Sequence, residues 1–144
     1  MIEGIASLDK LDLLGQQHLA GLSRRWLALL LRATWFQTDA VRAHARLFFT
    51  DFEFVGPDHT DEALLTELQG FPAAVRDYFC YLLLDFAVVD PELEDEPLKA
   101  AYALAQPLDW SDRLEALTVR ELKLKKKDAK ALREAALPPP EAAS

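Results

Sequence analysis

Three acidic residues alternate along one turn of the sequence, between residues 90 and 95, and this spacing is suited to binding a cation. Carboxylates at the first, third and fifth positions resemble the first oxygen ligands of a calcium-binding loop. The remainder of that loop is missing, because Asp95 stands where the sharp turn needs Gly and Ala101 where a bidentate Glu belongs. Two interpretations stay open: the acids cap the following helix, or a divalent cation binds at Asp90, Glu92 and Glu94.

A lysine-rich segment differs most from the composition of the rest of the chain. Residues 118–137 contain seven basic and three acidic residues, a local charge of +4, whereas the whole chain carries −8. One interpretation is an arm that attaches to an acidic partner, to anionic lipid or to nucleic acid. The other is a solvated helix that lies against the protein's own acidic surface, anchored by Leu122, Ala129 and Leu132. The segment has no aromatic residue for base stacking. The candidate partner-binding residues are Lys123, Lys125, Lys126, Lys127 and Lys130.

Catalytic motifs are not recognisable in the sequence. Nucleophilic catalysis needs a base beside the nucleophile, and the three histidines, His18, His44 and His59, stand in no distinctive motif. Nucleophile-elbow, phosphate-loop and dinucleotide-binding sequences are also missing. We therefore expect a protein that is not an enzyme. A ligand pocket or catalytic site within the aromatic core is the lowest-ranked alternative.

Composition restricts the class of protein. A chain of 144 residues with 51% hydrophobic residues is suited to one compact domain with a sizeable core. The single cysteine, Cys80, excludes an intrachain disulfide, and its apolar surroundings predict a buried thiol. The sequence starts without a basic segment followed by an apolar run, and its apolar stretches are shorter than the roughly 20 residues of a spanning helix. These features predict a cytoplasmic protein without a transmembrane segment.

The elements that must position these residues are expected to be helices throughout. Glycine and β-branched residues are few, whereas Ala, Leu, Glu and Arg are abundant. We predict an all-α, single-domain bundle of six or seven helices over residues 1–137, followed by a disordered Pro/Ala-rich tail at 138–144. Apolar spacing over residues 8–31 predicts one broken helix or two short ones, and the apolar run within 72–89 predicts the central helix.

Capping residues indicate where the other helices begin. Asp39 is expected to cap a helix that continues through Phe52, and Thr60 to cap a short helix. Ser111 is expected to cap a further helix, and Thr118 with Glu121 matches a capping box that would start the final basic helix of residues 118–137. Phenylalanines 48, 49, 52 and 54 lie on more than one side of a single helix, so part of this aromatic cluster is expected to face a partner.

The order of elements from Leu82 to Leu117 resembles the tellurite-resistance TerB-like helical domains. Ala87-Val88-Val89-Asp90 followed by the acids of residues 92–96 corresponds to the family's Ala-x-x-Asp segment and acidic turn, with Pro91 where the family commonly has Gly. The resemblance implies an all-helical bundle of two related halves with the acidic turn on its surface. It also implies a role in stress-response or metal-linked assemblies.

Together these observations favour a non-enzymatic, cytoplasmic, helical protein-interaction domain, modulated by a divalent cation at the acidic turn. Its partner would be another protein or a second copy of the chain. The alternative is an acidic domain that is tethered to nucleic acid or anionic lipid by its lysine-rich C-terminal helix.

Overall fold

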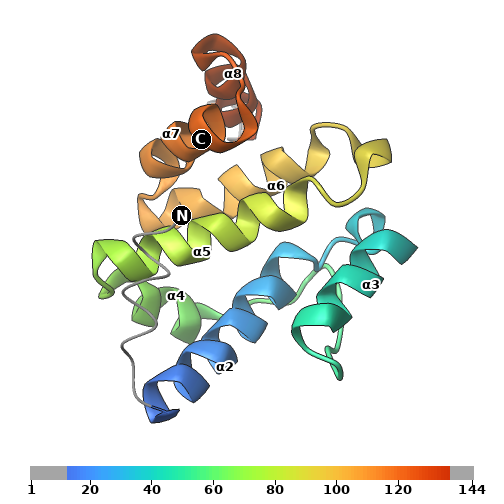
Figure 1. Cartoon of the computed structure of the whole chain (residues 1–144), viewed down its shortest axis with the longest axis vertical. Coiled ribbons are helices and arrows are strands. Elements are labelled where there is room, and N and C mark those ends of the chain that lie inside the picture. The colour runs from blue at the N-terminus through green and yellow to red at the C-terminus, as the bar shows by residue number, and fades with distance from the viewer. Residues whose placement is uncertain (1–12, 137–144) are drawn as a thin grey trace.

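The computed structural model describes residues 13–136 and shows a bundle of helices (Figure 1). Within these residues the chain forms seven α-helices and three short 3-10 helices, and it contains no strand. The prediction of an all-α, single-domain bundle of six or seven helices is confirmed. The tail proposed for residues 138–144 lies outside the described residues.

Short connections join the helices. In chain order they are α2 (Leu13–Leu30), η1 (Thr34–Phe36), α3 (Asp39–Phe48), α4 (Glu62–Gln69), α5 (Ala73–Ala87), η2 (Pro91–Leu93), α6 (Glu96–Ala105), η3 (Gln106–Leu108), α7 (Ser111–Leu122) and α8 (Lys126–Ala136). The described part of the first predicted helical region is a single helix, because Gly15 and Gly21 are accommodated within α2 without a break.

Helix α5 is central, since α2, α6 and α7 all pack against it (Figure 1). This is the position that its wide apolar arc predicts. Trp26 of α2 is fully buried, and its indole Nε1 donates a hydrogen bond to the Phe79 carbonyl oxygen over 3.0 Å. Its ring meets those of Phe79 and Trp110 edge to face, with centroids 6.0 and 5.8 Å apart. Trp26 therefore connects α2, α5 and the start of α7.

The only cysteine lies inside this core. Cys80 of α5 is fully buried and unpaired, as its apolar surroundings predict. Burial, with a smaller contribution from the charge of Asp77, raises the pKa of the Cys80 thiol to about 12. The thiol therefore stays protonated at neutral pH and packs as a small apolar group.

Two helix caps lie one residue away from their predicted positions. The hydroxyl of Thr38, and not the carboxylate of Asp39, accepts a hydrogen bond from the backbone N–H of Val41 over 3.3 Å. Asp61, and not Thr60, caps α4 and accepts from the Leu64 N–H over 3.2 Å. In both cases adjacent residues could cap, and Asp61 is additionally held by hydrogen bonds from Arg25 of α2.

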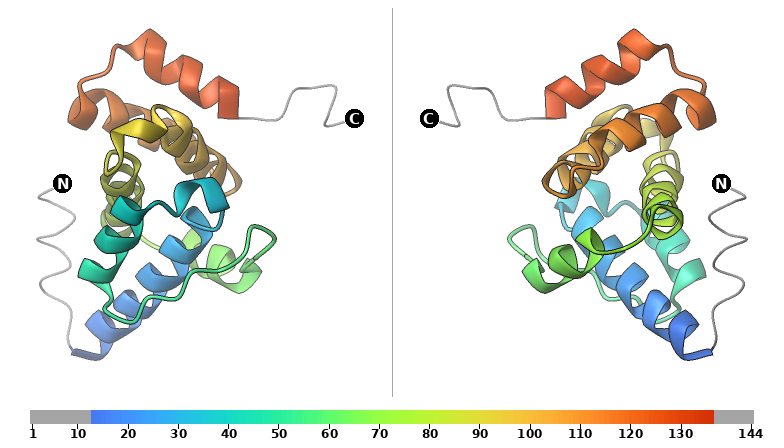
Figure 2. Two further views of the ribbon diagram at one scale, coloured as in Figure 1. Left: turned by 90° about the vertical axis from the view of Figure 1, so that its right-hand side faces the viewer. Right: turned by 90° about the vertical axis from the view of Figure 1, so that its left-hand side faces the viewer.

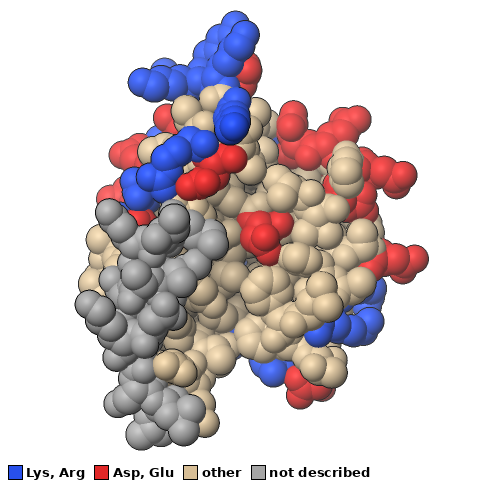
Figure 3. Space-filling view, viewed as in Figure 1, with Lys and Arg blue, Asp and Glu red and all other residues tan. Residues whose placement is uncertain are grey.

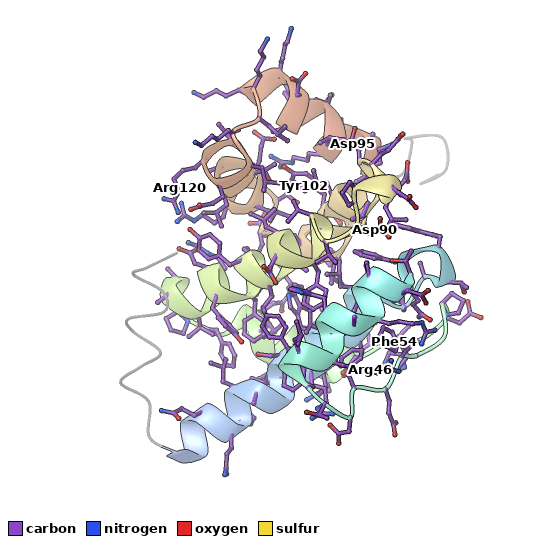
Figure 4. All side chains as sticks on the ribbon, turned by 45° about the vertical axis from the view of Figure 1, so that its right-hand side comes forward. Arg46, Phe54, Asp90, Asp95, Tyr102 and Arg120 are labelled. Carbon is purple, nitrogen blue, oxygen red and sulfur yellow. The ribbon has the colours of Figure 1, made fainter. Side chains whose placement is uncertain are left out.

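Helix α3 ends at Phe48, whereas the sequence predicts a helix that continues through Phe52 and ends near Gly56-Pro57. The chain then runs as a loop that carries aromatic side chains back onto the body, and Phe52 reaches the core from this loop. The Cζ atoms of Arg42 and Arg46 lie 4.6 and 5.9 Å from the ring centroid of Phe54 (Figure 4). These cation–π contacts hold the loop against α3. The aromatic residues can therefore pack on the body without a helix that continues past Phe48.

A helix does begin at Ser111, as predicted, but Ser111 does not cap it, and no helix begins at Thr118. Ser111 is the first residue of α7, and its buried hydroxyl makes no capping bond. Thr118 lies within α7, fully buried, where its hydroxyl donates to the Leu114 carbonyl over 2.7 Å and accepts from the Tyr102 hydroxyl. A threonine that bonds back to the preceding turn is compatible with a continuing helix, and this bond replaces the expected capping box.

The basic segment of residues 118–137 is therefore not one helix. Its first five residues end α7, and Lys123 then adopts a left-handed conformation with φ of 57° that terminates the helix. The carbonyl of Lys125 accepts from the N–H groups of Asp128 and Ala129 and starts α8. The break lets α8 fold back over α6 and α7 at one end of the molecule (Figure 2), where Ala129 is fully buried.

Replacing Lys123 by Gly is expected to stabilise the protein, because Gly adopts a positive φ without steric cost. We expect the free energy of unfolding to rise by about 0.5–1 kcal/mol in urea denaturation followed by circular dichroism. Lys127→Gly is the control, since Lys127 lies within α8 and the same change should destabilise the helix. A loss of stability in Lys123→Gly would contradict the assigned turn.

Candidate partner-binding surface

The acidic turn does not gather its carboxylates into a metal site. The Asp90 carboxylate accepts a hydrogen bond from the Glu92 N–H over 3.0 Å and caps the 3-10 helix η2. Glu94 adopts a φ of 55°, and Asp90 and Asp95 lie at the two ends of the turn (Figure 4). Across residues 13–136, no three His, Cys, Asp or Glu side chains form a group that could hold a metal ion. The cation predicted at Asp90, Glu92 and Glu94 therefore has no geometric support in this structure.

The capping interpretation of the acidic turn holds in a modified form. Asp90 caps η2, and Asp95 stands at the start of α6 without a side-chain capping bond. Glu96, in the first turn of α6, lies where a negative charge interacts favourably with the helix dipole. The acids therefore stabilise the starts of two helices, η2 and α6. The sequence predicted this role only for α6.

The structure supports part of one interpretation of the lysine-rich segment, that of a helix lying against the protein's own surface. As the anchoring stripe predicts, α8 packs through fully buried Ala129 and partly buried Leu132. Arg133 reaches the protein's own acidic surface, where its guanidinium lies 2.5 Å from Asp112 and 3.5 Å from Glu115 of α7. Helix α8 is thus bound to the body by apolar contacts and by this one arginine.

The lysines of this segment point away from the body. We call Lys123, Lys125, Lys126, Lys127 and Lys130 the lysine cluster; all five are exposed. Lys130 lies 3.9 Å from Glu134 of the same helix, and no described carboxylate is within ion-pair distance of the other four. Figure 3 shows basic atoms gathered at the end of the molecule formed by α8, away from most of the acidic atoms. The lysine cluster is a positive patch that the described residues do not neutralise.

The local electrostatics of α8 also favour an external anion. Lys126 and Lys127 occupy its first turn, beside the positive end of the helix dipole, with only Asp128 to offset them. Cations at this end destabilise a helix, typically by about 0.3–1 kcal/mol each at low salt. Negative charge supplied from outside would remove this cost.

A shallow groove of about 200 Å³ lies along the outer side of α5. Its walls come from α5 and α7, and its lining residues are Tyr81, Leu84, Asp85, Val88, Glu121 and Leu122. Tyr81, Leu84 and Asp85 of α5 and Val88, its C-cap, are spaced i, i+3, i+4 and i+7, which places them on one face of the helix. Val88 is 52% exposed although it is a β-branched apolar residue. We call this feature the α5 groove.

Helix α3 continues the apolar surface on the far side of Asp85. The His44 imidazole lies 2.7 Å from the Asp85 carboxylate and joins the two helices. Its ring packs edge to face against Phe48 and Phe86, with centroids 5.4 and 4.7 Å apart. Phe48 is 46% exposed and neighbouring Leu47 is also exposed. Within the aromatic cluster Phe48 is exposed, whereas Phe52 is buried; that the exposed part faces a partner stays a prediction.

Charges within the α5 groove are matched by residues of this chain. Asp85 pairs with His44, and the Arg120 guanidinium lies 3.1 Å from the Glu121 carboxylate. The Tyr81 hydroxyl also donates to Glu121 over 3.1 Å and, together with Arg120, lowers the pKa of that carboxyl. Arg120 is visible on the outer side of α7 in Figure 4. The groove therefore contributes little uncompensated charge of its own.

Sequence reasoning found the lysine cluster but missed the α5 groove. Its residues come from two helices separated by more than 30 positions, and none has a distinctive motif. The sequence held one signal of the groove, namely Val88. This residue follows the last buried turn of α5, and it is nevertheless strongly apolar. The other two histidines take structural positions: His18 pairs with Glu67, and the His59 carbonyl accepts from Arg32.

Comparison with protein-family models, with curated proteins and with solved structures finds no match to this chain. The resemblance to TerB-like domains, and the two related halves that it implies, therefore stay predictions. None of the helices within residues 13–136 is both long and apolar enough to span a membrane.

Proposed function

We propose that this chain is a protein-interaction domain that binds a helical segment of its partner in the α5 groove. The observation that carries the proposal is the outer stripe of α5, where Val88 at the end of the helix is 52% exposed and Leu84, which is 3% exposed, lines the groove beside it. An amphipathic helix laid into an apolar groove is a recurring mode of peptide recognition.

The surroundings of the groove support this mode of binding. Leu122 lines the groove on the α7 side, and on the α3 side the exposed Phe48 packs against Phe86 of α5, with ring centroids 5.6 Å apart. Aromatic residues at the centre of an interface commonly contribute most of its binding energy. Exposed apolar surface marks many binding sites, and Val88 at the end of α5 and Leu47 and Phe48 of α3 are exposed apolar side chains.

Site-specific photocrosslinking tests the proposal. We expect a photoreactive phenylalanine analogue at position 88, in cells that express the protein, to give a crosslinked adduct of defined mass. Phe48→Glu should abolish this adduct, because a charge at the groove edge disfavours apolar docking. The same analogue at Thr66, exposed on α4, is the matched control and should give no such adduct.

Repeating the reaction with purified protein identifies the kind of partner. An adduct of twice the chain's mass would show that a second copy occupies the groove. Identical adducts from positions 88 and 66, or an adduct at position 88 that survives Phe48→Glu, would refute the groove as the interaction surface.

A further inference from the structure

We infer that the partner is an acidic amphipathic helix, whose apolar side chains fill the α5 groove while its carboxylates contact the lysine cluster. The inference rests on the proposed function and adds the chemical class of the partner. It follows from the position of the lysine cluster relative to the groove and from the balance of charge between them.

The lysine cluster begins where the α5 groove ends. Leu122 lines the groove and is the last residue of α7, and Lys123 directly follows it. The left-handed turn at Lys123 redirects the chain, and Lys125, Lys126 and Lys127 come at the start of α8. A ligand in the groove would therefore have positive charge beside one of its ends.

The charge balance decides the sign of the partner. Asp85 and Glu121, the acids of the groove, are already paired with His44 and Arg120. Four lysines of the cluster have no ion-pair partner among the described residues, as the geometry above shows. Uncompensated charge at an interface selects a partner of opposite sign, and here that charge is positive.

The shape of the combined surface favours a helix over a bilayer or a nucleic acid. The stripe from Tyr81 to Val88 covers eight residues, which gives a rise of about 10 Å along the α5 axis and matches about two turns of a second helix. A flat bilayer would contact the lysine cluster but would leave the groove unfilled. Residues 118–136 contain no aromatic side chain on which bases could stack.

Two synthetic helices provide the probes for a test with the full chain. Both are fluorescein-labelled, 18-residue amphipathic peptides with the same leucine stripe; the polar face is Glu in one and Lys in the other. Binding is measured by fluorescence anisotropy at low and high salt. We expect the acidic probe to bind and the basic probe to bind at least tenfold more weakly, with an affinity for the acidic probe that falls as salt rises.

Matched variants separate the two parts of the surface. The triple substitution Lys125→Gln, Lys126→Gln and Lys127→Gln is expected to weaken binding of the acidic probe at least tenfold. The corresponding triple Lys→Arg variant keeps the charge and should retain binding. Val88→Gln, which is neutral and exposed, should weaken binding of the probe through the groove, and circular dichroism checks that each variant is folded.

The outcomes distinguish failure of the inference from failure of the proposed function. If Val88→Gln weakens binding but the triple Lys→Gln variant does not, the groove is supported as the binding site and the acidic partner is refuted. The acidic partner is also refuted if the basic probe binds better than the acidic one. If Val88→Gln leaves binding unchanged, the groove itself is refuted and the inference falls with it. Lysine-dependent binding to phosphatidylserine vesicles or to a 20-base-pair DNA duplex, without binding of the acidic probe, would also overturn it.

Discussion

Replacing Trp26 by Ala is expected to destabilise the protein by about 3–5 kcal/mol, the range found when a buried Trp or Phe is truncated. The ring is fully buried and contacts Phe79 and Trp110 edge to face. Its indole N–H also donates to the Phe79 carbonyl, so Ala removes a hydrogen bond as well as leaving a cavity. Because domains of this size are stable by only about 5–15 kcal/mol, the variant should be partly unfolded at moderate temperature.

Urea denaturation followed by circular dichroism measures this loss without depending on tryptophan fluorescence. Trp35→Ala is the matched control, because Trp35 is 44% exposed and stacks on Phe36 at the surface. We expect that variant to lose much less stability than Trp26→Ala. Similar losses in the two variants would show that Trp26 does not hold α2 against α5.

Replacing Asp61 by Ala is expected to cost about 2–3 kcal/mol, since Asp61 has two structural roles and a charged hydrogen bond alone contributes about 1.5–3 kcal/mol. Its carboxylate caps α4 and accepts two hydrogen bonds of 2.8 Å from the Arg25 guanidinium. The side chains of Asp61 and Arg25 are 15% and 41% exposed, so solvent screens this pair only in part. Asp61→Asn keeps a capping oxygen and should cost about half as much.

The Asp61 carboxylate also predicts an acid-dependent loss of stability. The hydrogen bonds from Arg25, opposed by partial burial, lower the pKa of Asp61 from its ordinary value of 3.8. A carboxyl with a lowered folded-state pKa contributes its full stabilisation above its unfolded pKa and loses it as the pH falls through the folded value. The stability difference between wild type and Asp61→Asn should therefore be constant near pH 7 and shrink below about pH 4.

Asp51→Ala provides the control for both measurements. Asp51 makes a similar pair with Arg24, at 2.9 Å, but its side chain is 83% exposed. Exposed ion pairs contribute little to stability, so this variant should unfold at nearly the same urea concentration as the wild type. A loss in Asp51→Ala equal to that in Asp61→Ala would mean that burial and capping are not what distinguish the two residues.

The helical class was predictable because local propensity and apolar spacing agree along most of the chain. The wide apolar arc of α5 predicted its central position, and the apolar surroundings of Cys80 predicted its burial. Helix ends were less predictable, because adjacent residues such as Thr60 and Asp61 can both cap. The choice of Asp61 depends on Arg25, a residue 36 positions away, which no local pattern reveals.

The candidate site was predictable only where its residues are adjacent in sequence. The lysine cluster lies within eight residues and was found from composition, but the helix break at Lys123 within it depends on folding α8 onto α6. The α5 groove brings Val88 beside Leu122 by tertiary packing, and no spacing rule relates these positions. The acidic turn shows the opposite failure, since its alternating carboxylates suggested ligands that the folded chain does not assemble.

The buried thiol of Cys80 can be used to measure how often the helical bundle opens. A thiol-specific reagent must reach the sulfur and reacts with the thiolate form. While α5 stays in the core, burial blocks access to Cys80 and its raised pKa keeps the thiol protonated. Labelling can then proceed only from molecules in which the centre of the bundle has opened. Because the chain has one cysteine, the reaction rate follows the population of that opened state, without an engineered label.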